Sequence, residues 1–298
     1  GQLLDSDPPL PGAAPAPDDA PADAEGRPAP AAPLPGTPAL EGWWAVAPEA
    51  AVLETDAWRL RAEAGRRVTV DPAPGTPPES LGLAVGYAAC MALLHQRGAA
   101  PLHASVVAGR GGAALLIGGP GAGKSTFAAL LSARGLACGG DDLAAVEFPA
   151  EGPPLAHRGL ATAKLFADSR AELGAGARAV VGAGEGFGKE VVALADPPWA
   201  RWPAPLRAVF ALEWLHPADA APELERLTPL EAVPLLRGAV NHPEFAAPLG
   251  LDRRYFALMV RLAAAVPVFA LRRPRRFAAA AEACALVERR LAGEETDR

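Results

Sequence analysis

The sequence predicts an α/β fold from three neighbouring patterns. Ala113 to Ile117 form an uninterrupted apolar run, which is typical of a strand buried on both faces. A glycine-rich loop follows, and then a helical stretch over about 125–133. Leu136 to Gly140 form a second short apolar segment. Strand, loop, helix and strand in this order make a βαβ unit, the building block of α/β folds.

Composition limits the class of protein. The chain has 298 residues, of which 50% are hydrophobic and 21% are charged, so we expect one core with a small appendage. The net charge of −6 argues against a general nucleic-acid binder. Cys90, Cys138 and Cys284 lie far apart, which excludes a disulfide scaffold and a zinc ribbon and favours a reducing cytoplasm. The longest apolar run, Leu81 to Leu94, is too short to span a bilayer, so no membrane segment is expected.

Residues 1–40 differ in composition from the rest of the chain. They hold six acidic residues and one basic residue and are rich in Pro and Ala. Such a segment buries little apolar surface, so we expect a largely disordered acidic arm. It has no basic region followed by an apolar one, so no secretory signal is expected and the protein is predicted to be cytoplasmic.

A small β-plus-helix appendage is predicted over 41–98. Three stretches rich in Val, Trp, Leu and Thr are predicted strands, at 43–47, 51–55 and 58–70. Asp71 to Gly75 contain two prolines and end this pattern. The apolar, Ala-rich stretch at 79–97 is followed by Gly98, which predicts a helix.

The core is assigned to 99–292, with a tail at 293–298. Glycines alternate over Gly182–Gly188, which predicts a hairpin or a mobile loop. Thr228 to Glu231 match a capping box with Pro at the first helical position. The other predicted core elements are strands at 104–108, 206–214 and 267–271 and helices at 252–265 and 275–292.

A phosphate-binding motif lies inside the βαβ unit. Gly118 to Ser125 match the pattern G-x-x-x-x-G-K-[ST] in full. Its glycines let backbone N–H groups face phosphate oxygens, and the following helix directs the positive end of its dipole at them. Lysine is rare in this chain, since only three of the 28 lysines and arginines are lysines. A lysine at the position that the motif requires therefore argues against a chance glycine-rich turn. The predicted nucleotide-binding residues are Gly118, Gly119, Pro120, Gly121, Ala122, Gly123, Lys124, Ser125 and Thr126. Lys124 is expected to reach the β- and γ-phosphates and Ser125 to ligate Mg²⁺.

Two acids and a histidine are the other candidates for chemistry. Asp141 and Asp142 follow the strand after the motif's helix, which places them at the edge of the sheet where ligands bind. One carboxylate can hold Mg²⁺ and the other can take a proton from an attacking hydroxyl. A polar turn is the alternative. His103 could contact the transferred phosphate or tune the acid, with a structural histidine as the alternative.

Other cations and aromatic residues have a structural and a functional interpretation. Lys164 and Lys189 could each clamp a phosphate or be solvated surface charges. The arginines within 272–276 are predicted to form a polar turn, with docking of an acidic peptide as the alternative. Five tryptophans are predicted to be core or satellite-cluster residues, namely Trp43, Trp44, Trp199, Trp202 and Trp214.

Three segments resemble the HPr serine kinase/phosphorylase family: Pro101–Ser105, Gly118–Thr126 and Gly135–Leu143. The match is best with a diverged HPr-kinase-like branch that includes kinases found with lasso-peptide and other peptide-maturation systems. The resemblance is specific over about 99–145 and weaker over 41–98 and 200–292. It implies a P-loop core of the HPr kinase/phosphoenolpyruvate carboxykinase type.

The resemblance implies an ATP- and Mg²⁺-dependent transfer of the γ-phosphate to a serine hydroxyl of a protein or peptide. It implies Asp141 as the acid/base, His103 and Lys124 as further catalytic residues, and Asp142 with Ser125 as the magnesium partners. It is also compatible with a homo-oligomer.

Two other functions remain open on the sequence. The first is a kinase of a small-molecule acceptor with a carboxykinase-like pocket. The second is a nucleotide-binding regulatory or maturation partner without turnover. The sequence departs from HPr kinases at Leu143, where they commonly have Arg, so HPr itself and the reverse phosphorylase reaction are not implied.

Overall fold

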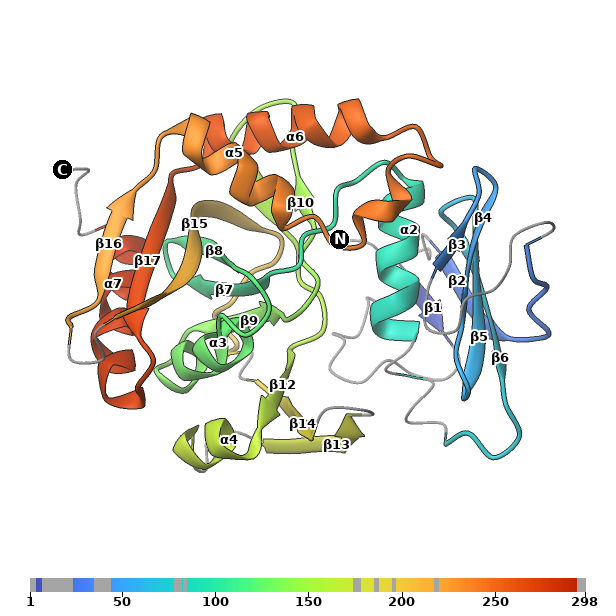
Figure 1. Cartoon of the computed structure of the whole chain (residues 1–298), viewed down its shortest axis with the longest axis horizontal. Coiled ribbons are helices and arrows are strands. Elements are labelled where there is room, and N and C mark those ends of the chain that lie inside the picture. Colours follow the sequence, from blue (N-terminus) through green and yellow to red (C-terminus); the bar gives the residue numbers. More distant parts are fainter. Residues whose placement is uncertain are drawn as a thin grey trace. The chain divides into compact units, whose positions relative to one another are not determined.

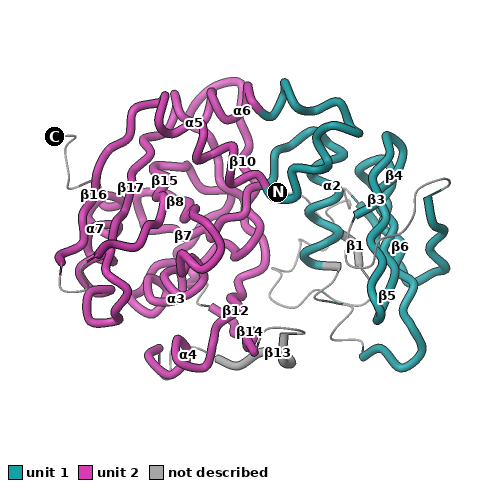
Figure 2. The backbone as a smooth tube through the Cα atoms, viewed as in Figure 1, with its two compact units in different colours: residues 1–101, 241–255 teal, residues 102–240, 256–298 magenta. Residues whose placement is uncertain are grey.

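A computed structural model of the chain has the mixed α/β architecture that the sequence predicts (Figure 1). The structure describes residues 4–6, 24–34, 44–77, 82, 85–173, 178–184, 188–194, 197–216 and 220–293. The chain divides into two compact units, coloured separately in Figure 2. Unit 1 comprises residues 1–101 and 241–255, and unit 2 comprises residues 102–240 and 256–298.

Unit 1 is built on a six-stranded sheet in the order β1-β2-β6-β5-β4-β3. Its strands are β1 (Leu4–Ser6), β2 (Ala24–Pro28), β3 (Trp44–Val46), β4 (Ala50–Glu54), β5 (Trp58–Glu63) and β6 (Arg67–Pro72). β2 pairs in parallel with β1 and β6, and the other neighbours are antiparallel. The single strand predicted over 58–70 is two strands, because Ala64 and Gly65 turn the chain with φ values of +50° and +66°.

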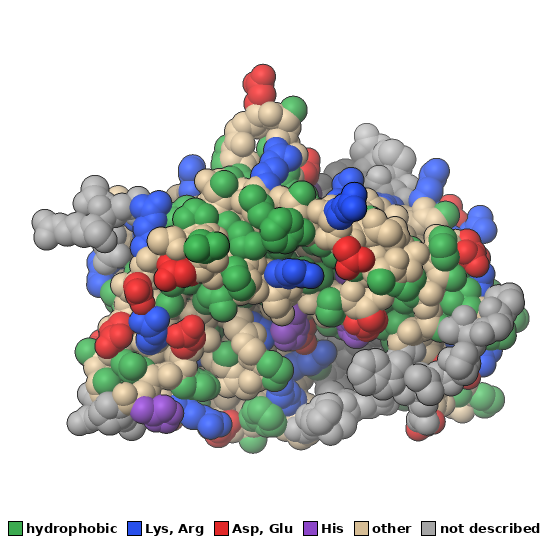
Figure 3. Space-filling view, turned by 45° about the horizontal axis from the view of Figure 1, so that its top comes forward, with side chains coloured by type: hydrophobic (Ala, Val, Ile, Leu, Met, Phe, Trp, Pro, Cys, Tyr) green, Lys and Arg blue, Asp and Glu red, His purple; other side chains and the backbone are tan. Residues whose placement is uncertain are grey.

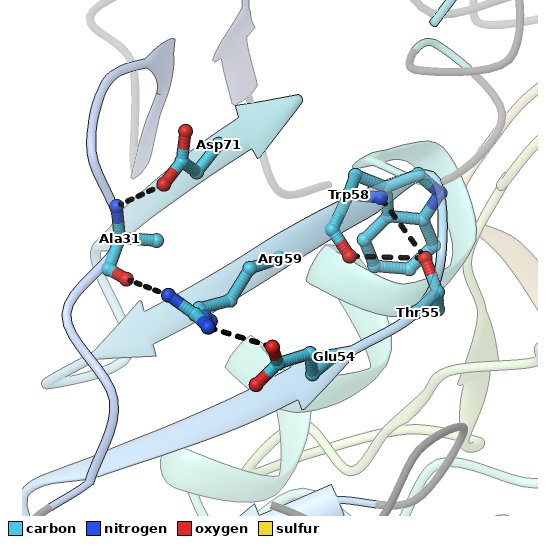
Figure 4. A network of polar contacts seen from close by, with 6 residues as sticks. All are labelled: Ala31, Glu54, Thr55, Trp58, Arg59 and Asp71. Atoms are coloured by element: carbon cyan, nitrogen blue, oxygen red, sulfur yellow. Dashed lines mark hydrogen bonds and ion pairs between the residues drawn. The ribbon is translucent and has the colours of Figure 1, made fainter. Parts of the chain in front are cut away.

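Residues 24–34 are ordered, although they fall in the predicted acidic arm. Figure 4 shows how Ala31 is tied to the sheet. Its N–H donates to Asp71 (3.3 Å), and its carbonyl accepts from Arg59 (3.3 Å), which also binds Glu54 (2.6 Å). The two bonds of Ala31 and the pairing of β2 use backbone groups of this segment. Amino-acid composition gives no signal for such bonds, because every residue type carries these groups. Residues 1–3, 7–23 and 35–40 of the arm, and residues 294–298 of the predicted tail, lie outside the described residues.

A helical segment and a returning stretch of chain complete unit 1. A π-helical turn, η1 (Val85–Ala89), leads into α2 (Cys90–Gln96), within the predicted helix 79–97. The buried His95 stacks on Phe245, which ends the 3₁₀ turn η3 (Pro243–Phe245), with 4.4 Å between ring centroids. Residues 241–255 therefore belong to unit 1, whereas the sequence prediction includes them in the 99–292 core.

Unit 2 contains an eight-stranded sheet. Its strands are β7 (Ser105–Gly109), β8 (Gly112–Ile117), β9 (Ala137–Gly140), β10 (Val146–Glu147), β11 (Leu155–Ala156), β15 (Ala204–Leu215), β16 (Glu223–Arg226) and β17 (Val268–Pro274). Their order is β10-β11-β15-β8-β7-β9, with β17 beside β15 and β16 beside β17. β8, β15 and β17 are parallel neighbours, and every residue of β8 is buried, as its apolar run predicts.

Helices cover this sheet and shape its core. α3 (Lys124–Ala133) and α7 (Ala280–Ala292), the latter after the 3₁₀ turn η4 (Phe277–Ala279), pack together against the strands (Figure 1). Phe127 and Leu131 of α3 share one apolar cluster with Phe210 of β15 and Val287 of α7. Two further helices are α5 (Pro229–Gly238) and α6 (Asp252–Ala265). The predicted capping box at Thr228 is confirmed, since Thr228 and Glu231 bond reciprocally.

A second, three-stranded sheet packs on α3. Its order is β12-β14-β13, formed by β12 (Thr162–Phe166), β14 (Lys189–Ala193) and β13 (Arg178–Gly184), with α4 (Ala167–Leu173) after β12. Leu165 and Val192 face Ala129 of α3 in a buried cluster. β13 and β14 pair antiparallel, which favours the hairpin of the two alternatives predicted around Gly182–Gly188, a hairpin or a mobile loop; residues 185–187 lie outside the described residues.

Exposed apolar side chains occur on α5 and α6. They are Leu230, Leu235, Phe256 and Val260. Figure 3, turned to bring these helices forward, shows hydrophobic and charged side chains mixed across this face. Among the described residues, no helix has both the length and the apolar character needed to cross a membrane.

Candidate functional site

Three strand ends meet at one edge of the unit 2 sheet. β8 and β9 run in the same direction, because each pairs antiparallel with β7 between them. Ser105, the first residue of β7, lies opposite Leu116 near the end of β8, and Val106 lies opposite Gly140 at the end of β9. The start of β7 and the ends of β8 and β9 therefore share an edge, and all predicted site residues lie next to these strand ends.

The glycine-rich loop Gly118–Gly123 joins β8 to α3. Gly121 and Gly123 have φ values of +77° and +80°, in the left-handed region that favours glycine. A Cβ at Gly123 would lie 3.0 Å from Nη2 of Arg273, whereas one at Gly121 would meet nothing within 4 Å. Because a helix cannot satisfy its own first N–H groups, the start of α3 adds backbone donors to this loop. The loop is thus a tight turn that leads directly into the first N–H groups of α3.

Lys124, the first residue of α3, folds over the loop. Its side chain is buried, and Nζ donates to the carbonyl of Gly118 at 2.8 Å and to that of Gly119 at 3.4 Å. Burial is the largest influence on its pKa and lowers it, while the carboxylates of Asp141 and Asp142 act in the opposite direction. The ammonium therefore lies in the field of both acids.

Asp141 follows β9 and turns its carboxyl into the protein. Oδ1 accepts a hydrogen bond of 2.5 Å from Oγ of Ser105, and Oδ2 is buried without a hydrogen-bond partner among the described residues. Burial, followed by the charge of Asp142, raises the pKa of the Asp141 carboxyl, and the hydroxyls of Ser105 and Ser125 oppose that rise. The result is a carboxyl with raised proton affinity and one oxygen left without a partner.

Asp142, the next residue of the same turn, meets His103 through its backbone carbonyl. Asp142 has a φ of +64°, a left-handed conformation that Asp tolerates better than most residues. Its carboxylate pairs with Nζ of Lys164 at 3.2 Å, and its carbonyl lies 3.3 Å from Nδ1 of His103. Burial, then the charge of Lys124, lowers the pKa of His103, which favours a neutral imidazole. Nδ1 donates to the carbonyl in the tautomer that carries its proton there.

Besides Lys124, the other two lysines of the chain, Lys164 and Lys189, contribute positive charge to this site. Lys164 of β12 binds Asp142, as described above. Lys189 of β14 lies over the ring of Phe166 at 4.9 Å, and its charge contributes to the lowered pKa of Lys124. The two lysines left open by the sequence are thus carried by the three-stranded sheet, on strands that pair directly.

Thr126 turns toward α4. Its hydroxyl donates to Oγ of the buried Ser169 at 3.1 Å. The sequence predicts Thr126 as a nucleotide-binding residue and gives no sign of this contact with α4. Ser125, by contrast, faces the carboxyl of Asp141.

Sequence reasoning missed two side chains beside the loop. The sequence predicts Trp214 as a core or satellite-cluster residue and Arg273 as part of a polar turn, but both bond to the loop's main chain. Arg273 is only 7% exposed, so it is not part of a solvated turn. Their placement follows from the pairing of two strands distant in sequence, which no local pattern reports. Of the predicted core tryptophans, Trp202 packs against Gly139, and Trp43 lies outside the described residues.

The oxygens at this edge suit a magnesium ion shared with a phosphate. Oδ2 of Asp141 is buried without a partner, Asp142 lies on the same turn, and Ser125, the second residue of α3, faces the Asp141 carboxyl. Within the described ranges, no group of three or more His, Cys, Asp and Glu could hold a metal by itself. Magnesium in phosphate sites commonly uses one or two carboxylates together with substrate phosphates, so these residues fit such an ion.

Comparison with known proteins gives distant structural similarity only. No family model and no curated protein matches the sequence. Among solved structures, the chain aligns with the HPr(Ser) kinase/phosphatase from Coxiella burnetii at 10% sequence identity and a TM-score of 0.32. The alignment covers 65% of this chain and 99% of that chain.

Proposed function

We propose that this protein is an ATP- and Mg²⁺-dependent kinase that transfers the γ-phosphate of ATP to a serine hydroxyl of a protein or peptide. The observation that carries the proposal is the buried, unpartnered Oδ2 of Asp141, beside a glycine-rich loop that leads into Lys124 and Ser125. A buried acceptor without a donor costs free energy unless a ligand supplies one. An acceptor hydroxyl is such a donor, and the loop next to it offers groups that bind phosphate.

The loop and Lys124 would hold the phosphates. Nζ of Lys124 is already drawn to two neutral carbonyls of the loop, those of Gly118 and Gly119. A phosphate oxygen is a stronger, charged acceptor for the same ammonium. The first turn of α3 directs its free N–H groups and the positive end of its dipole to the same place.

Asp141 would act as the acid/base. Its raised pKa increases its affinity for a proton at neutral pH, which suits a general base. The hydrogen bond from Ser105 to Oδ1 fixes the carboxyl and leaves Oδ2 to accept the hydroxyl proton. His103 and Lys164 would support the turn through the carbonyl and the carboxylate of Asp142.

Ser125 and Asp142 would hold magnesium. When bound, the ion neutralises charge on the phosphates. The Asp142 carboxylate pairs with Nζ of Lys164 at 3.2 Å, so a cation already holds it before any ion is present.

The test is label transfer from γ-labelled ATP with Mg²⁺ to serine-containing peptides, including those encoded beside the gene. The Asp141→Asn variant should lose at least about a hundredfold in transfer, because general-base catalysis contributes that much, and it should keep its affinity for ATP. Asp252→Asn, the same change at an exposed helix start, is the matched control.

Each outcome of this test points to a different function. Near-normal transfer by Asp141→Asn would rule out the assigned base. Label on a small molecule, with none on peptides, would favour the small-molecule kinase. Tight ATP binding without transfer to any acceptor would favour a nucleotide-binding partner.

A further inference from the structure

Two strands of the unit 2 sheet reach past the end of β8 and run alongside the glycine-rich loop. Ile117, the last residue of β8, lies opposite Ala211 of β15. β15 continues beyond this point to Leu215, and Trp214 lies opposite Arg273 of β17 in the parallel register. The side chains of Trp214 and Arg273 are therefore carried to the level of the loop by strands distant from it in sequence.

Both side chains bond to consecutive carbonyls of the loop. Nε1 of Trp214 donates to Gly121 at 3.0 Å, and Nη2 of Arg273 donates to Ala122 at 2.6 Å. The Arg273 guanidinium lies 4.1 Å from the centroid of the Trp214 ring and 5.0 Å from that of Phe127. Trp214 and Arg273 form one wall of the loop, on the side of its carbonyl groups.

The charge of Arg273 has no counter-charge among the described residues. Its contacts are a carbonyl and two aromatic rings, all neutral, and its Nε is buried without a partner. The side chain is 7% exposed, and burial lowers its pKa to about 10. Its neighbour Arg272 differs in every respect, because it is more exposed and pairs with two carboxylates, Glu213 at 3.1 Å and Glu225 at 2.6 Å.

A buried cation without an anion is costly, because desolvation is not repaid by pairing. Cation–π contacts offset only part of such a cost. Arg273 is held against a loop whose sequence and geometry suit a polyphosphate. The uncompensated charge is therefore next to the loop that is expected to bind the anionic ligand.

We propose that Arg273 is a positioning residue of a nucleoside triphosphate site, with the bound polyphosphate as its counter-charge, and that Trp214 fixes the loop and the guanidinium in place. The inference rests on the proposed nucleotide-binding role of the loop. Arg273 acts through the carbonyl of Ala122 and through its field, and no direct contact with phosphate is required of it.

The test compares Arg273→Met with Arg272→Met, two neutral replacements at adjacent positions of β17. The dissociation constants of ATP and of inorganic tripolyphosphate are measured by calorimetry with Mg²⁺, and thermal midpoints are measured with and without each ligand. For Arg273→Met we expect both dissociation constants to rise at least about tenfold, the scale of a charge-assisted interaction. The ligand-free midpoint should stay unchanged or rise, because an unpaired buried charge has been removed. Arg272→Met should bind both ligands like the wild type.

Two further variants separate charge from packing. Arg273→Lys keeps a cation and should recover part of the affinity that Arg273→Met loses. Trp214→Phe keeps an aromatic ring but removes the donor to Gly121. It should raise the dissociation constants of both ligands without changing which of the two binds more tightly. Recovery by lysine is not expected of a residue that only fills space.

Unchanged ligand affinity in Arg273→Met would overturn the inference. A fall in the ligand-free midpoint, with Arg273→Lys as weak a binder as Arg273→Met, would also overturn it and make Arg273 a packing residue. If the wild type binds ATP through Arg273 but transfers no phosphate, the inference stands and the kinase proposal fails. If it transfers phosphate while Arg273→Met binds normally, the reverse holds. A wild type that binds neither ligand overturns both.

Discussion

Oγ of Ser105 donates a hydrogen bond of 2.5 Å to Oδ1 of Asp141, joining the start of β7 to the residue that follows β9. Ser105 is fully buried, so water does not compete for this bond. The bond satisfies one carboxylate oxygen and leaves the other without a partner. The orientation of the proposed base is therefore set by a serine outside the glycine-rich loop.

The first prediction concerns this bond. In Ser105→Ala the carboxylate loses a hydrogen bond that stabilises its charged form, so the pKa of Asp141 rises further. The base form then appears only at higher pH, and the acid limb of the transfer rate should move to higher pH. Rates from pH 5 to 9 measure this shift. Ser132→Ala, which changes a buried serine on α3, should leave the limb in place. An unmoved limb in Ser105→Ala would refute the coupling.

The second prediction is a loss of stability in acid that comes from His95. Its Nε2 donates to the carbonyl of Asn241 (2.8 Å), and in the neutral ring Nδ1 accepts from the hydroxyl of Tyr255 (2.6 Å). Burial lowers its pKa from 6.5 to about 4. Between these values the unfolded chain binds more protons than the folded one, so stability falls as pH falls through this window, by up to about 3 kcal/mol.

Urea denaturation at pH 7 and pH 4.5 measures this contribution. His95→Gln cannot titrate, so the part of the pH dependence due to His95 should vanish, although the variant is less stable at pH 7. An identical difference between the two pH values in wild type and variant would show that His95 does not carry the effect.

The third prediction concerns the pair formed by Lys164 and Asp142. Lys164 is 48% exposed, so Lys164→Met should change the free energy of unfolding by less than about 1 kcal/mol. It also removes a cation that would compete with the proposed magnesium ion for the Asp142 carboxylate. The Mg²⁺ concentration for half-maximal transfer should therefore decrease. Arg170→Met, which breaks an ion pair with Glu190 near the same small sheet, should leave it unchanged, and an increased Mg²⁺ requirement in Lys164→Met would contradict the assignment.

The fourth prediction compares two glycine substitutions. A Cβ at Gly139 of β9 would lie 2.5 Å from the Trp202 ring, so Gly139→Ala should destabilise the fold by about 1–3 kcal/mol through overpacking. A Cβ at Gly238, at the end of α5, meets nothing within 4 Å. Gly238→Ala should raise stability by about 0.5–1 kcal/mol through helix propensity. Chemical denaturation measures both, and equal effects would show that the contact with Trp202 is not rigid.

The sequence predicts the central part of the site because that part is continuous. The buried strand β8, the glycine-rich loop, α3 and β9 follow one another, and each has a strong local pattern. The same stretch places Lys124, Asp141 and Asp142 near one another without knowledge of the rest of the fold. His103 joins them because β7 pairs with both β8 and β9.

What could not be predicted depends on contacts between distant segments. The wall residues Trp214 and Arg273 meet the loop through parallel pairing of β8, β15 and β17, and a register between distant strands has no local signal. β12 and α4 are short and lack strong periodicity. β2 was missed because its segment is rich in Pro and Ala, and its order depends on backbone pairing with β6.

The reach of β15 and β17 past the end of β8 also has a consequence for folding. Neighbouring segments of a chain meet sooner than distant ones, because closing a long loop costs more entropy. The stretch from β7 to β9 can therefore assemble before β17 arrives, with its loop still lacking the Trp214–Arg273 wall. Nucleotide capture during refolding would then follow the docking of β17, and it would serve as a kinetic marker for completion of the unit 2 sheet.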